Sequence, residues 1–220
     1  LNPMCCAGPS KRSPSRTGSM VDTNVIVAGK SVVLRAKSVD DAADDHRWRE
    51  DPELAELDAA TVLRQSVEDF TRDLGNELKF PTPWVKRYAI DTHDGKHIGN
   101  CMFYDIDLRS GEAELGIMIG DKAYWSQGYG TETVCLLLDH MFTTYAFKRV
   151  YLHTLTWNKR ARNSFRKSGF QDVREVRRSG LDFVNMEVWR HEWEAMRNAS
   201  ADEDQTSNDI SSSENSNSPS

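Results

Sequence analysis

Residues 114–132 read ELGIMIGDKAYWSQGYGTE, and this stretch decides the predicted fold. Its first part completes a predicted strand over residues 112–119. A loop with Gly128 and Gly130 follows, and an apolar stripe from Thr131 to Tyr145 predicts a helix that starts at once after the loop. Backbone N–H groups at a helix N-terminus bind anions, and glycine lets a phosphate approach them closely. The stretch therefore predicts a site for a phosphate-bearing ligand between a strand and a helix.

The pattern on both sides of this stretch predicts a mixed α/β domain with about seven strands and about four helices. The order in which the strands pair does not follow from the pattern. The predicted strands span residues 31–36, 84–91, 97–105, 112–119, 148–155, 170–178 and 181–189, and the predicted helices span 39–50, 66–78, 131–145 and 158–168.

The two ends of the chain differ in composition from its centre. Residues 1–24 are rich in Pro, Ser, Gly and basic residues, and residues 199–220 are an acidic stretch of Ser and Asn. Neither end has the apolar side chains that offset the entropy cost of ordering a chain. We therefore expect two disordered tails around one folded domain of residues 25–198.

Composition excludes several classes of function. The net charge is −6, which gives no electrostatic case for binding nucleic acid, and no apolar run reaches the ~18 residues of a membrane span. The four cysteines and six histidines show no metal-ligand spacing, so we expect no metal and no catalytic histidine. Two cysteines in apolar segments fit a reducing compartment, which predicts a cytoplasmic protein.

Residues 114–132 resemble the acetyl-CoA pyrophosphate loop of the GNAT superfamily of N-acetyltransferases. The ELG, the Trp and the G-x-G-T-E resemble in particular the ribosomal-protein N-terminal (Rim-type) acetyltransferases. Trp125 stands where the general motif Q/R-x-x-G-x-G/A has Gln or Arg. The resemblance continues into Trp157-Asn158 and residues 165–170, and covers about residues 31–193 in all.

The resemblance implies a GNAT-type, mostly antiparallel sheet with helices on both faces, and a fourth and fifth strand that splay apart. The pantetheine of the cosubstrate acetyl-CoA would lie in the splay and pair with backbone groups of Ile117, Met118 and Ile119. Backbone amides of residues 127–131 would bind its phosphates. The cofactor-binding residues that the resemblance implies are therefore Ile117, Met118, Ile119, Gln127, Gly128, Tyr129, Gly130, Thr131, Asn158 and Phe165.

Glu114 is the candidate general base, because an amine must lose a proton before it attacks a thioester. Two alternatives stay open: Glu112 and Glu114 form an ordinary solvated sheet face, or another acid is the base. No general acid is assigned, because Phe165 stands where many family members have Tyr, and Ala161 where they have Ser. The acidic residues between 40 and 45 are expected to form the exposed start of a helix.

These expectations combine into an acyltransferase that moves acetyl from acetyl-CoA to a primary amine. A protein N-terminus is the first candidate acceptor. Two alternatives remain: transfer to a small amine such as a polyamine, an amino acid or an amine antibiotic, and a CoA-binding module without catalysis. The resemblance also suggests a homodimer.

Overall fold

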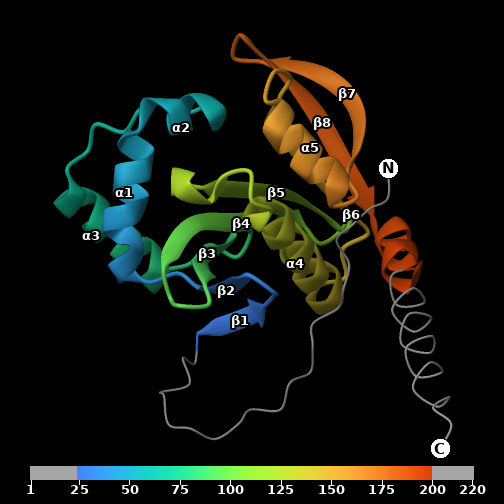
Figure 1. The fold of residues 1–220 in the computed structure, drawn as a ribbon, viewed down its shortest axis with the longest axis horizontal. Helices are drawn as coiled ribbons and strands as arrows, with labels where there is room; N and C mark the ends of the chain where they lie inside the picture. The colour runs from blue at the N-terminus through green and yellow to red at the C-terminus, as the bar shows by residue number, and fades with distance from the viewer. Residues whose placement is uncertain (1–23, 200–220) are drawn as a thin grey trace, which may run out of the picture.

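The computed structural model describes residues 24–199, which form one eight-stranded sheet in the order β1-β2-β3-β4-β5-β6-β8-β7 (Figure 1). Neighbouring strands are antiparallel except β5 and β6, which are parallel, so the expected mixed, mostly antiparallel sheet is confirmed. The strands are β1 (Val25–Ala28), β2 (Val32–Ala36), β3 (Lys86–Thr92), β4 (His97–Asp107), β5 (Glu112–Ile119), β6 (Arg149–Leu155), β7 (Gln171–Arg178) and β8 (Leu181–Trp189).

One strand was not predicted. β1 has only four residues and pairs with β2 at the edge of the sheet. It lies within the predicted domain of residues 25–198, directly after the predicted tail, and its apolar run is too short to stand out as a strand. Nearly all of the two predicted tails lies outside the described residues.

The predicted helices are present, with two additions. The helix expected at 39–50 is a 3₁₀ turn followed by α1, and residues 52–57 and 190–199 are also helical. The helices are α1 (Ala42–Glu50), α2 (Pro52–Leu57), α3 (Val67–Lys79), α4 (Tyr129–Thr144) and α5 (Lys159–Lys167), with 3₁₀ turns at Val39–Asp41 and Lys122–Tyr124.

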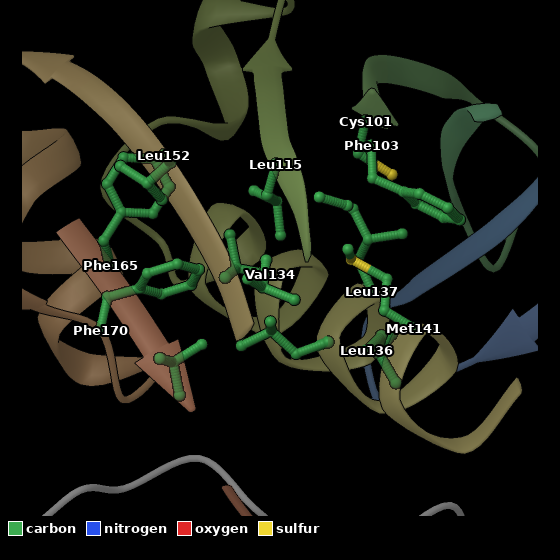
Figure 2. Close-up of a cluster of buried hydrophobic side chains, with 14 of the residues drawn as sticks. Cys101, Phe103, Leu115, Val134, Leu136, Leu137, Met141, Leu152, Phe165 and Phe170 are labelled. Atoms are coloured by element: carbon green, nitrogen blue, oxygen red, sulfur yellow. The ribbon is translucent and has the colours of Figure 1, made fainter. Parts of the chain in front are cut away.

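The main core lies between the sheet and α4. The predicted apolar stripe of α4 is buried, with Leu137 and Met141 fully inaccessible. Figure 2 shows these side chains facing Phe103 of β4 and Leu115 of β5, with Phe165 of α5 at the other end of the cluster. Alternate residues of β4 and β5 therefore point to α4, and the residues between them point to the opposite face.

Helix α1 lies on that opposite face. Its Asp45 accepts a hydrogen bond from Asn100 of β4, at 2.6 Å, and Asn100 alternates with the core residue Cys101. The ring of Trp48 covers Gly120, where no side chain would fit. Helices α1–α3 gather at one side of the sheet and α5 lies beside the β7–β8 hairpin, so the end of β5 sits between the two groups (Figure 1).

Candidate active site

Strands β5 and β6 pair over only three residues. Their register runs from Glu112 opposite Arg149 to Glu114 opposite Tyr151, and no pair follows although β5 continues to Ile119. The expected splay is therefore present and begins directly after Glu114. A cleft of about 890 Å³ opens there, bordered by both strands, α4, α5 and the helices α1–α3.

Part of β5 presents free backbone groups to this cleft. The N–H of Gly120 donates to the carbonyl oxygen of Ile98 in β4. The backbone groups of Met118, two residues before Gly120, point to the same edge of the strand and therefore also face β4. The backbone groups of Ile117 and Ile119 face the splay instead, and the Ile119 carbonyl there accepts from the Trp125 indole at 2.7 Å. The backbone groups of Ile117 are thus available to a ligand in the splay, while Met118 lines the cleft with its side chain.

The glycine loop ends at the N-terminus of α4. Gly128 has φ = 95° and precedes the helix without any side-chain cap, so the first amides of α4 are not occupied by a capping oxygen. A Cβ at Gly128 would meet no atom within 4 Å, which means that open space lies in front of it. This geometry fits an anion on the amides, as expected for a phosphate.

Most of the other predicted cofactor residues also border the cleft. Thr131 bonds to Ser164 of α5 at 2.8 Å, and Asn158 caps α5 by accepting from the N–H of Ala161 at 3.2 Å. Of the predicted set, the side chains of Gln127 and Tyr129 are not among the residues that line the cleft. Those that line it are Glu114, Ile117, Met118, Ile119, Gly128, Gly130, Thr131, Asn158 and Phe165.

Phe165 is part of the core as well as of the cleft wall. Its side chain is buried, and its ring meets Phe170 edge-on with centroids 5.9 Å apart. It therefore packs and offers no proton, as its missing hydroxyl indicates.

Two cations beside the loop were missed by the sequence analysis. The guanidinium of Arg160 lies 3.6 Å from the centre of the Trp125 ring, and Lys167, at the other end of α5, also lines the cleft. The neighbouring Arg162 and Arg166 both pair with Asp172, whereas no described residue accepts a hydrogen bond from Arg160. A stacked guanidinium keeps its N–H edges free for phosphate oxygens. Trp125, which replaces the Gln or Arg of the general motif, thus holds an arginine from α5.

Glu114 is buried at the apex of the cleft. Only 7% of it is exposed, so the solvated-face alternative is wrong for this residue. Its Oε1 atom lies 2.8 Å from Nδ1 of His153, and Nε2 of His153 lies 3.2 Å from Nδ2 of Asn185. The sequence analysis expected no catalytic histidine and did not foresee this contact of His153 with Glu114. The sequence could not show this contact, because it depends on the register of β5, β6 and β8.

Tyr104 of β4 lies opposite Glu114 in the register and also lines the cleft. Burial raises the pKa of Tyr104 well above its ordinary value, and the adjacent Glu114 carboxylate raises it further. The phenol therefore stays protonated at neutral pH. It comes directly before a bulge in β4, where Asp105 has φ = 49°.

A buried charge network forms the wall on the α1 side. Lys37 lies 2.6 Å from Asp45, and His97 lies 3.3 Å from Asp45 and 3.2 Å from Asp91. Asp41 is only 3% exposed and pairs with Arg35. The expectation of an exposed acidic helix start is thus wrong for Asp41 and Asp45, because Asp41 meets Arg35 of β2 and Asp45 meets Lys37, the residue that directly follows β2.

The lining as a whole is not acidic. It holds six Lys or Arg residues and four Asp or Glu residues, and two of the carboxylates are already paired, Asp45 with Lys37 and Glu77 with Arg87. The cations are Lys37, Arg49, Arg87, Arg160, Lys167 and Arg178, and the carboxylates are Asp45, Asp58, Glu77 and Glu114.

A splayed parallel strand pair, a glycine loop at a helix N-terminus and a buried carboxylate between them define a site for acyl transfer from a phosphate-bearing donor. Comparison with known families agrees: the model of the acetyltransferase (GNAT) domain matches residues 31–171, well over half of the chain. The protein belongs to this family and is an acetyl-CoA-dependent N-acetyltransferase.

One sequence relative supports this assignment, and two solved structures share the fold. An uncharacterised N-acetyltransferase p20 of Bacillus licheniformis is 38% identical over 121 residues, which cover 54% of this chain and 67% of that protein. The spermidine N-acetyltransferase of Vibrio cholerae, solved with CoA and spermine, superposes with a TM-score of 0.66 at 18% identity, over 74% of this chain and 97% of the other. The aminoglycoside acetyltransferase AAC(6')-Ib, solved with coenzyme A, gives 0.65 at 20% identity, over 76% and 99%.

Residues 24–199 hold neither a cluster of metal-ligating side chains nor a membrane-spanning helix. No group of three or more His, Cys, Asp or Glu side chains in this range is placed to hold a metal ion. None of the helices in the same range is long and apolar enough to cross a membrane.

Proposed function

We propose that the protein acetylates a primary amine with Glu114 as the general base, and that the amine is a protein N-terminus. The observation that carries the proposal is the buried Glu114 carboxylate at the point where β5 and β6 separate, bonded to His153 at 2.8 Å. At this apex it borders the same cleft as the free edge of Ile117 and the glycine loop.

Glu114 and the backbone of Ile117 have separate roles in the proposed transfer. Acetyl-CoA supplies the activated acetyl thioester. Glu114 takes the proton from the ammonium group, since amines have ordinary pKa values of about 8 at an N-terminus and about 10.4 on lysine. The N–H of Ile117, at the free edge of β5, is the donor for the thioester oxygen, where charge develops as the amine attacks. The leaving group is the CoA thiolate, a weak base because a free thiol has a pKa of ~8.5, so its departure requires little help from an acid.

The charge of the cleft supports an acceptor with a single amine. A polycation needs several free carboxylates, and this lining has more cations than carboxylates. A protein α-amine carries one charge and agrees with the Rim-type resemblance of residues 114–132. Transfer to a small amine remains the second candidate, because proteins described as spermidine and aminoglycoside acetyltransferases share the fold.

Release of CoA thiol from acetyl-CoA, measured against matched amines, tests both parts of the proposal. The panel holds a short peptide with a free N-terminus, the same peptide with its N-terminus blocked, spermidine and kanamycin. We expect fast release with the free peptide only. Faster release with spermidine or kanamycin would transfer the assignment to small amines. If none of the amines in the panel causes thiol release, the proposed transfer is contradicted.

A further inference from the structure

Three polar side chains form a row across three neighbouring strands. Glu114 of β5, His153 of β6 and Asn185 of β8 lie on the face opposite α4, and His153 is directly opposite Asn185 in the register. The side chains of His153 and Glu114 are only 10% and 9% exposed, and Asn185 is 5% exposed. Glu114 and His153 line the cleft, whereas Asn185 is not among the lining residues.

The hydrogen bonds of Asn185 define the state of the histidine. Its Nδ2 lies 3.3 Å from the Leu152 carbonyl oxygen, which only accepts, so this atom is the amide nitrogen. The same Nδ2 lies 3.2 Å from Nε2 of His153 and donates to it, which makes Nε2 an acceptor. The ring is then neutral and carries its proton on Nδ1, which donates to Glu114 Oε1.

We propose that His153 and Asn185 are positioning residues that hold Glu114 in one orientation for proton transfer, an inference that rests on the proposed role of Glu114 as the base. Because the lone pair of Nε2 is occupied by Asn185, His153 is not itself the base. Its Nδ1–H fixes Oε1 of the carboxylate, and the Tyr104 phenol also hydrogen-bonds to this carboxylate. The carboxylate lone pairs that these two donors leave open would take the proton of the substrate amine. A buried carboxylate needs such a donor, because burying a charge without a hydrogen-bond partner is strongly unfavourable.

Burial and ion pairs act on the groups that surround this row. Burial raises the pKa of Tyr104 and of Tyr151, so both phenols stay protonated. Arg149 is held by Glu112 at 2.9 Å and by Glu187 at 2.6 Å. The titratable or charged neighbours are Tyr104 and Asp105 on β4, Glu112 on β5, Arg149 and Tyr151 on β6, and Glu187 on β8.

Two variants of His153 separate positioning from packing. His153→Asn places an amide N–H near the position of Nδ1, whereas His153→Leu fills the space without any donor. We expect His153→Leu to lower kcat by roughly tenfold or more, less than the 10²–10⁴-fold typical for loss of a general base, and His153→Asn to recover most of it. The Kd of acetyl-CoA, measured by calorimetry, should be unchanged in both variants.

The pH dependence of kcat/KM gives two shifts of opposite sign. His153→Leu removes a donor that favours the ionised carboxylate, so the acid limb of the profile should move to higher pH. Asn185→Asp offers a carboxylate to Nε2, which makes His153 an imidazolium beside Glu114, so the acid limb should move to lower pH. A purely structural role would change stability and leave the acid limb in place.

Glu114→Gln, measured in the same series, separates the two levels of the proposal. If Glu114→Gln loses activity while the His153 and Asn185 variants keep the wild-type acid limb, the positioning role is wrong and the base stands. If His153→Leu is as inactive as Glu114→Gln and His153→Asn does not recover, His153 acts directly and the inference is overturned. An active Glu114→Gln overturns the proposed base itself.

Discussion

The two halves of the cleft are built in different ways. The cofactor half comes mainly from one continuous stretch, in which the end of β5, the glycine loop and the start of α4 follow one another. The catalytic half is a row of side chains from separate strands, in which Glu114 meets a histidine 39 residues away and that histidine meets an asparagine 32 residues further on. The first half binds with backbone groups and the second acts through side chains.

This difference decides what each half tolerates. Backbone amides bind a phosphate whatever most of the neighbouring side chains are. The loop therefore depends mainly on its glycines and on the helix that follows it. The row Glu114–His153–Asn185 depends on the register of three strands, because a slip by one residue would turn each side chain to the other face. Substitutions in the two halves should therefore alter different quantities.

Gly128→Ala should have the largest effect on cofactor binding. The new Cβ meets no protein atom but occupies the open space before the first amides of α4, so acetyl-CoA should bind at least about tenfold more weakly, or ~1.4 kcal/mol. Gly95→Ala is the matched control, because Gly95 also has positive φ and open surroundings but lies in the β3–β4 turn. Both variants should lose similar stability from the strained backbone. Equal affinities in calorimetry would show that the loop does not bind the phosphates.

Arg160→Ala should have a smaller effect on the same half. Loss of an exposed ion pair with a phosphate, worth ~0.6–1 kcal/mol, should weaken acetyl-CoA binding by about threefold to fivefold at low salt. Arg166→Ala removes the same charge from the same helix, but Arg166 is already paired with Asp172. A titration at two salt concentrations checks this, and identical losses in both variants would argue against a phosphate contact by Arg160.

The sequence predicts the local parts of the molecule well. Seven of the strands, the helix after the glycine loop and the loop itself follow from apolar spacing and glycine positions. The strand order and the partners of single side chains do not. His153 has no partner near it in the sequence, and Asp45 of α1 meets Lys37, which directly follows β2. The role of Arg160 depends on Trp125, which lies on another element.

Gly120→Ala tests how α1 is placed at the wall of the cleft. The new methyl group would overlap the buried ring of Trp48, so α1 must shift. The free energy of unfolding should therefore fall by roughly 1–3 kcal/mol. Gly75→Ala within α3 meets only ordinary contacts and should be neutral or stabilising by up to about 1 kcal/mol. Urea unfolding of both variants gives the comparison. Equal stabilities would mean that Trp48 does not anchor α1 on Gly120.

The smallest effect concerns pH and the buried network. Burial opposes the charge on His97, but the hydrogen bonds that its ring donates to Asp45 and Asp91 outweigh burial and raise the pKa of His97. The stability that this charge contributes is complete below the unfolded pKa of about 6.5 and is lost as pH rises through the folded value. The wild type should therefore lose more unfolding free energy than His97→Gln between about pH 6 and pH 8. Parallel curves for the two proteins would show that His97 is not charged in the folded state.

The most direct test of the central claim is kcat for Glu114→Gln at saturating acetyl-CoA, with the Kd of acetyl-CoA measured on the same sample. Gln keeps the shape of the side chain and an oxygen for the His153 donor, but it takes up no proton. The account predicts that kcat falls by about 10²–10⁴-fold while the Kd stays at the wild-type value. A variant that binds acetyl-CoA normally and keeps the wild-type kcat would contradict the assignment of Glu114 as the base.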